Sequence, residues 1–160
     1  NEKINNWRDM RAGDVTDDTV NTVAWCHGAA GILLSRIQMY NCLNTVEPNE
    51  LGICGQQILE KVTDDILRAY KKLKQYPYRD SFCLCHGTYG NVWILEDALN
   101  KCDLIQKGAE DEEMILEDMS IKLLPQERLN PGLMNGYGSV LYYLIKRQGY
   151  DVPDVLRLEV

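Results

Sequence analysis

The chain has 160 residues, of which 45% are hydrophobic and 26% are charged, a composition typical of one globular domain that excludes a disordered or fibrous protein. Its 24 acidic and 17 basic residues give a net charge of −7, which argues against nucleic acid as a partner because that partner is bound through its phosphates. No apolar stretch approaches the roughly 20 residues that a membrane span requires.

Apolar residues recur at spacings of three and four along several segments, which predicts helices. In chain order these are the segment after Gly31 up to Tyr40, the segment 59–73 ending before Pro77, the segment 92–105 with Lys107-Gly108 as its C-cap, and the segment between Gly138 and Gly149. The acidic run 110–113 is expected either in the first turn of a further helix or on a solvated face. No segment alternates with a period of two, so we predict an all-α fold.

Three of these helices have similar entrances. Residues 25–31 read Trp-Cys-His-Gly-Ala-Ala-Gly, residues 84–90 read Leu-Cys-His-Gly-Thr-Tyr-Gly, and residues 133–138 read Leu-Met-Asn-Gly-Tyr-Gly. Helix-pair repeats cannot bury their apolar faces alone, so they stack or close into a ring. We therefore expect the three glycine-rich loops to lie at one end of the assembly.

Two copies of Cys-His-Gly place sulfur and imidazole donors at equivalent entrances, as a thiolate-rich zinc site requires. Cys26, Cys85 and His86 are the candidate ligands. The third entrance offers Met134 and Asn135, so a fourth strong ligand is not expected there and a position stays open for substrate. Cys83 is a less favoured fourth ligand, because two residues is a short separation from Cys85 for tetrahedral coordination.

Zinc with two thiolates and one imidazole is formally neutral. Such a metal lowers the pKa of an incoming thiol and leaves the bound sulfur electron-rich. This donor set therefore favours reactions at a substrate sulfur over hydrolysis.

These motifs, together with Pro-Gly-Leu-Met-Asn-Gly at 131–136, resemble the last three motifs of lanthionine synthetase C-like cyclases, particularly the C-terminal part of class II lantibiotic-modifying enzymes. The resemblance covers the chain from Asn6-Trp7 to its last helix. It implies part of an α/α toroid with a central zinc on Cys26, Cys85 and His86. It also implies that a cysteine thiolate of a precursor peptide adds to dehydroalanine or dehydrobutyrine to form a thioether ring.

The enolate that thiolate attack leaves must be protonated, and His27 is the candidate proton donor. The family has a further important histidine on an upstream motif, which this sequence lacks. We therefore expect residues 1–160 to be a C-terminal fragment of a cyclase domain, inactive alone and prone to self-association. The third motif is one residue short of the family pattern after Asn135-Gly136.

Two other functions fit the same residues. The first is addition of a small thiol such as glutathione to an electrophile, and the second is a non-catalytic helical peptide-binding module with structural zinc or none. With no signal peptide visible near Asn1, the six cysteines are interpreted as thiols of a reducing, cytoplasmic protein and not as a disulfide framework.

The remaining cysteines and the aromatic residues of the entrances are assigned to packing. Cys42, Cys54 and Cys102 lie on or beside apolar stripes and are predicted to be small buried side chains. The aromatic residues predicted to pack in the core, with a peptide groove as the alternative, are Trp25, Trp93, Tyr89 and Tyr137.

Overall fold

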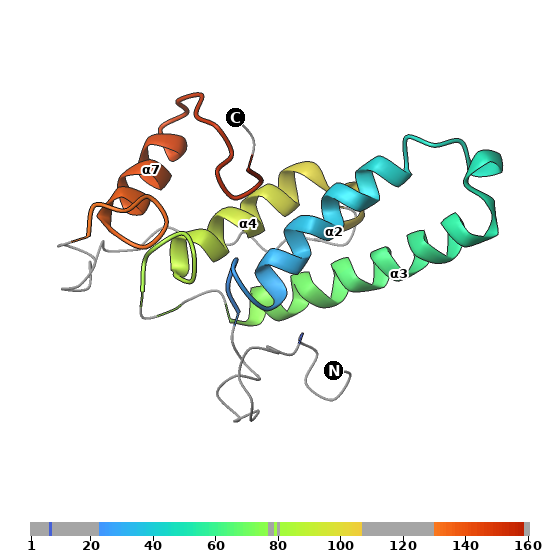
Figure 1. Ribbon diagram of the computed structural model, residues 1–160, viewed down its shortest axis with the longest axis horizontal. Helices are drawn as coiled ribbons and strands as arrows, with labels where there is room; N and C mark the ends of the chain where they lie inside the picture. The colour runs from blue at the N-terminus through green and yellow to red at the C-terminus, as the bar shows by residue number, and fades with distance from the viewer. Residues whose placement is uncertain (1–6, 8–22, 77–78, 80, 107–129, 159–160) are drawn as a thin grey trace.

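The computed structural model describes Trp7 and residues 23–76, 79, 81–106 and 130–158. Within these ranges all regular secondary structure is helical, with no strand, which confirms the all-α prediction. The helices are α2 (Ala29–Leu43), α3 (Pro48–Gln75), α4 (Thr88–Lys101), α5 (Asp103–Gln106) and α7 (Tyr137–Arg147) (Figure 1). The predicted cap at Lys107-Gly108 and the acidic run 110–113 lie outside the described residues.

Helices α2 and α3 form an antiparallel hairpin (Figure 1). The buried side chains of Leu33 and Ile37 on α2 and of Ile66 on α3 belong to one hydrophobic core. The two helices are also joined by an ion pair between Arg36 Nε and Asp65 Oδ2, 3.1 Å apart. Arg68 binds the other oxygen of the same carboxylate at 2.6 Å, so this buried acid has two cationic partners.

Helix α3 begins earlier than the sequence pattern predicts. Pro48 stands in its first turn, and Gly52 (φ 66°) bends the backbone there before the helix continues. Residues 52–54 and 56–58 are exposed, with Ile53 at 79%. The apolar stripe from Leu59 onward therefore marks only the part of α3 that packs against the core, which is why periodicity missed the start.

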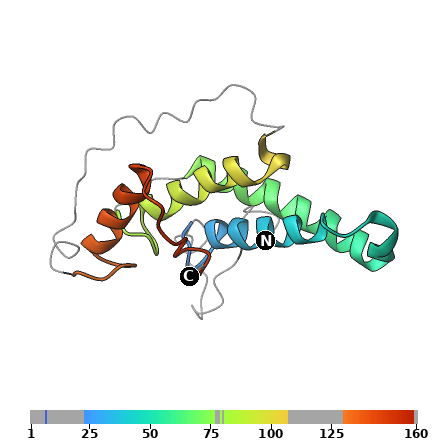
Figure 2. The ribbon, with the colours of Figure 1, turned by 90° about the horizontal axis from the view of Figure 1, so that it is seen from above.

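Helix α4 lies beside α2 and runs in the same direction (Figure 1 and Figure 2). Residues 88–95, 97 and 98 of this helix are all buried. At the far ends of the two helices, Asn41 Nδ2 donates a hydrogen bond to the carbonyl of Lys101 at 3.2 Å. Helix α4 is thus the most enclosed element, and it begins directly after the second Cys-His-Gly loop.

The prediction of one helix over 92–105 is wrong, because Cys102 interrupts it. Cys102 has an extended backbone (φ −126°, ψ 103°), and the short α5 follows it. The thiol of Cys102 and the side chain of Ile105 are still buried. The apolar spacing therefore correctly predicts which side chains are buried on both sides of the break. It does not predict the break itself.

Helix α7 joins the others through aromatic side chains. Tyr143 stacks on Tyr89 with ring centroids 4.6 Å apart, and the Lys146 ammonium lies 4.4 Å from the Trp93 ring centroid. Tyr89 and Trp93 are buried, which confirms their predicted packing role. For Tyr137 that prediction is wrong, because this residue, the first of α7, is 37% exposed.

We predict that Gly90→Ala strongly destabilises the fold. A Cβ atom at Gly90 would lie 1.8 Å from the carbonyl oxygen of Leu84, so the loop backbone would have to move. We expect the free energy of unfolding in urea to fall by at least about 2 kcal/mol. Gly149→Ala is the control, because φ is +83° there but no atom lies within 4 Å, and a loss of about 1 kcal/mol is expected. Equal losses in the two variants would contradict the steric argument.

Candidate functional site

Each of the three glycine-rich loops ends at the same point relative to its helix. Gly28, Gly87 and Gly136 are the N-cap residues of α2, α4 and α7. None of these caps has a side-chain hydrogen bond, so each helix begins directly after its glycine without a capping side chain. The three motifs are therefore equivalent in the structure, because each places its glycine at the same backbone position before a helix.

The first two loops also fold back in the same way. Gly31 donates its N–H to the carbonyl of Ala24 at 3.3 Å, and Gly90 donates to the carbonyl of Cys83 at 3.4 Å. Glycine is needed at both places because a Cβ would lie 2.1 Å from the Trp25 carbonyl oxygen in the first loop, as it would near Leu84 in the second. The helix start is thus pressed against its own loop.

The third loop keeps most of this geometry despite its shorter motif. Tyr137 donates its N–H to the carbonyl of Asn130 at 2.9 Å, as Thr88 does to the carbonyl of Ser81 at 2.8 Å in the second loop. Counting from the N-cap glycine, the buried Ser139 takes the place of the last glycine. The third loop is therefore not shortened: it has the same length as the second up to its N-cap glycine, and serine replaces the last glycine three residues later.

The three loops are joined through the residue before His or Asn in each motif. The N–H of Cys26 donates to the carbonyl of Cys85 at 3.3 Å, and the N–H of Cys85 donates to the carbonyl of Met134 at 3.0 Å. These three residues hold equivalent positions in the repeat. We call this series of two bonds the loop ladder, and it confirms that the three loops lie at one end of the helices.

A buried amide side chain adds a second link between the first two loops. Asn91, fully buried in the first turn of α4, donates from Nδ2 to the carbonyl of Val23 at 3.1 Å. This residue follows the second Cys-His-Gly loop, and Val23 precedes the first. Sequence reasoning missed Asn91, and the only signal was a polar residue among the apolar positions of α4.

The candidate donors differ in exposure. Cys26 and His86 are exposed, whereas Cys85 is half-buried. The sulfur of Cys26 lies 3.0 Å from Nδ1 of the half-buried His27. The donor chemistry and the adjacent backbones of Cys26 and Cys85 suit zinc.

No three donors converge in the part of the chain described here. Among its His, Cys, Asp and Glu side chains there is no group of three or more placed to hold a metal ion. The ligand set of Cys26, Cys85 and His86 therefore stays a prediction.

Cys83 is enclosed in the core. Its side chain is fully buried, and the Ser81 hydroxyl donates to its sulfur at 3.2 Å. The exposed Cys26 and His86 have a different environment. These contacts make Cys83 a packing residue of the second loop.

The packing prediction for the other three cysteines holds for one of them. Cys102 is buried, and burial raises the pKa of its thiol above the usual range. Cys42 and Cys54 are exposed, so the prediction is wrong for both. They lie near the turn between α2 and α3 and at the bent start of α3, where no neighbouring helix covers them. All six cysteines are free thiols.

The C-terminal turn, residues 154–158, lies against the first Cys-His-Gly loop. The indole N–H of the half-buried Trp25 donates to the carbonyl of Leu156 at 2.8 Å. Arg157 forms a buried ion pair with Asp97 of α4, and its Nε lies 3.7 Å from Asp154 Oδ2. Sequence reasoning gave this turn no role, since a contact across 131 residues leaves no local pattern.

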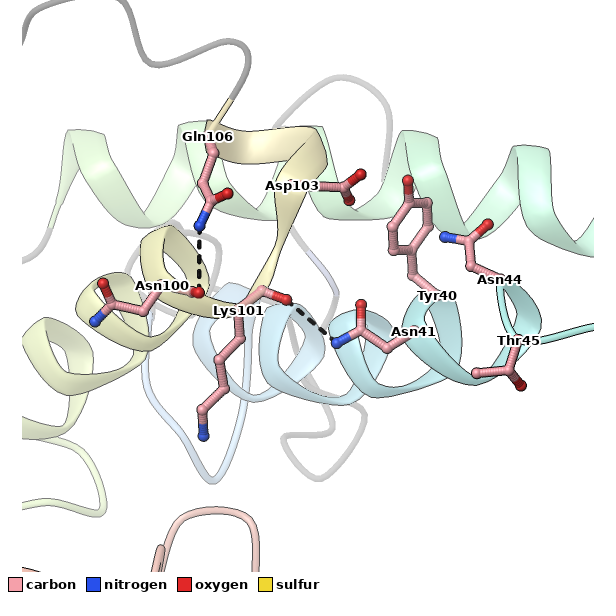
Figure 3. Close-up of a pocket in the computed structure, with 8 residues that line it drawn as sticks. All are labelled: Tyr40, Asn41, Asn44, Thr45, Asn100, Lys101, Asp103 and Gln106. Atoms are coloured by element: carbon pink, nitrogen blue, oxygen red, sulfur yellow. Dashed lines mark hydrogen bonds between the residues drawn. The ribbon is translucent and has the colours of Figure 1, made fainter.

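Among the described residues, two of the pockets lie beside α2. The larger, of about 570 Å³, is lined by polar side chains at the C-terminal ends of α2 and α4, away from the cysteine loops (Figure 3). In it, Gln106 Nε2 donates to the carbonyl of Asn100 at 3.2 Å (Figure 3). The smaller, of about 330 Å³, lies between Cys26, His27 and the C-terminal turn. The smaller pocket is therefore the one next to the candidate chemistry.

Comparisons with known proteins agree with the motif analysis. Residues 1–159 match the family described as lanthionine synthetase C-like protein. The chain is also 30% identical, over 155 residues, to the lacticin 481/lactococcin biosynthesis protein LcnDR2 of Lactococcus lactis subsp. lactis. That match covers 88% of this chain but only 15% of the relative. No solved structure matches, and none of the described helices is both long and apolar enough to cross a membrane.

We predict that alkylation will separate the cysteines by burial. Iodoacetamide near neutral pH should modify Cys26, Cys42 and Cys54 first, because the reactive thiolate must be accessible. Cys83 and Cys102 should react only after unfolding in urea. Because the pKa of Cys102 is raised, a moderate increase in pH should not make it reactive. Peptide mapping by mass spectrometry provides the measurement, and alkylation of Cys102 as fast as that of Cys54 would contradict the structure.

Proposed function

Since the chain belongs to the lanthionine synthetase C-like family, we propose that it contributes the zinc-binding part of a lanthipeptide cyclase. Its substrate is a precursor peptide that carries cysteine and a dehydroalanine or dehydrobutyrine. The product is a thioether ring. Free thiols throughout the chain suit a reducing, cytoplasmic setting for this reaction.

The observation that carries the proposal is the loop ladder. It joins the backbones of Cys26 and Cys85, the two proposed thiolate ligands, by one hydrogen bond. His86 follows Cys85 directly and is exposed, so its imidazole is accessible to a metal ion. Zinc held by these residues supplies a Lewis acid that lowers the pKa of an incoming thiol.

The equivalent position of the third loop supports an open site. Met134 has only a weakly accepting thioether, and the following Asn135 has no imidazole or thiol. Three strong protein ligands leave one coordination position for the substrate. The third loop therefore supports the ladder by its backbone carbonyl and leaves the ligand set at three.

His27 is the proposed proton donor. When the peptide thiolate forms its bond to the β-carbon of the dehydro residue, the electrons of the double bond move toward the carbonyl as an enolate. The α-carbon then takes up a proton. His27 follows a proposed ligand, lies half-buried and lines the smaller pocket, where it can hold that proton near the reacting carbon.

We expect the intact protein to contain about one zinc ion per chain when purified under reducing conditions. Cys85→Ala should lose that zinc, as measured by elemental analysis, because two remaining ligands bind zinc weakly. Cys54→Ala is the matched control, since Cys54 is exposed on α3, away from the cysteine loops, and this variant should keep its zinc. A zinc-free wild type, or zinc retained in Cys85→Ala, would refute the ligand assignment.

We expect His27→Ala to slow ring formation by about 100-fold without loss of zinc, because a lost general acid costs roughly that much. The assay follows alkylation-resistant product from a dehydrated precursor peptide by mass spectrometry, in the intact protein. Glutathione with a simple Michael acceptor tests the small-thiol alternative. If Cys26→Ala abolishes the folded circular dichroism signal as well as turnover, the structural-zinc alternative is favoured instead.

A further inference from the structure

The smaller pocket adjoins both the proposed ligand Cys26 and the proposed proton donor His27. Its volume is about 330 Å³, near the lower end of the range for small-molecule sites. The side chains that define its character are those of Trp25, Ile32, Gln38, Leu156 and Leu158. The lining thus combines these apolar side chains with a few polar ones, namely Gln38, Ser35, His27 and Arg157, as is typical of sites that bind and orient an organic ligand.

The wall opposite α2 is the C-terminal turn, which is held firmly. The carbonyl of Leu156 accepts the hydrogen bond from Trp25, and the N–H of Leu156 is directed to the Asp154 carboxylate at 3.2 Å. The Arg157 guanidinium, whose side chain is 6% exposed, is paired with the buried Asp97. Its charge is therefore compensated, so the pocket does not favour an anionic ligand.

Leu158, at the rim of this pocket, is held in an unfavourable state. Its φ is +59°, in the left-handed region that side chains with a Cβ seldom adopt. Its apolar side chain is 76% exposed to solvent. Backbone strain at a non-glycine residue concentrates where ligands are clamped. Leu158 therefore offers an uncovered apolar side chain, held in a strained backbone conformation, at the rim of the pocket.

We propose that this pocket is a subsite of the precursor-peptide site. It binds the apolar side chain of a peptide residue that lies next to the reacting cysteine. The inference rests on the proposed function, which supplies the peptide. Its position follows from the lining, since the same pocket contains Cys26 and His27. Leu156, Leu158 and Trp25 provide the apolar contact, and the Gln38 carboxamide is available to the peptide backbone.

Leu158→Asn tests the subsite without disturbing the fold. Asparagine tolerates a positive φ better than leucine and adds no charge. Ile53→Asn is the matched control, because Ile53 is an aliphatic residue 79% exposed at the start of α3, outside the pocket. The probes are two fluorescein-labelled peptides. Each contains one dehydroalanine and has serine in place of the reacting cysteine. The residue next to that serine is leucine in one peptide and a second serine in the other. Binding to the intact protein is measured by fluorescence anisotropy.

We expect Leu158→Asn to weaken binding of the leucine peptide about tenfold and that of the serine peptide less than twofold. Ile53→Asn should change neither. Equal affinity of the wild type for the two peptides, no detectable binding, or equal effects of the two variants would overturn the proposal. Because neither peptide carries a reacting thiol, this result is independent of the zinc and ring-formation assays, which test the proposed function separately.

Discussion

The loop ladder is the constraint on which the site depends. Each of its two hydrogen bonds joins the backbone of one glycine-rich loop to the equivalent residue of the next, from Cys26 to Cys85 to Met134. Because these bonds use main-chain N–H and carbonyl groups, they hold whatever the side chains are. The side chains at these positions are therefore not needed for the ladder. They are thiols in the first two loops and a thioether in the third.

Two features keep the ladder in place. Close contact of each helix start with its own loop requires glycine, as at Gly31 and Gly90. The enclosed α4 then provides polar groups that reach in two directions, Asn91 to the backbone before the first loop and Asp97 to the C-terminal turn. Buried polar side chains need hydrogen-bond partners, so Asn91 and Asp97 mark two of the contacts through which α4 fixes its neighbours.

The proposed metal site and the proposed peptide subsite lie in one small region and share Cys26. The proposed ligands come from adjacent loops, and the smaller pocket is lined by the first of these loops, by α2 and by the C-terminal turn. Trp25 connects the first loop to the C-terminal turn, since it precedes Cys26 and donates a hydrogen bond to the carbonyl of Leu156. A peptide bound against Leu158 would contact the loop that carries the proposed ligand Cys26, so the proposed substrate and metal positions would be linked through this loop.

The sequence by itself determined the all-helical fold, the repeat of three loops, the family and the candidate residues, because glycine spacing and apolar periodicity are local consequences of backbone geometry. It did not determine the break at Cys102, because the apolar, buried positions continue across that break. It did not determine the bend at Gly52 either, because the start of α3 is exposed and the apolar stripe begins only at Leu59. Only the tertiary structure brought Asn91 to Val23 and the C-terminal turn to Trp25. Those hydrogen bonds pair polar groups that would be costly to bury without a partner. They join residues far apart in the chain, so no local spacing in the sequence predicts them.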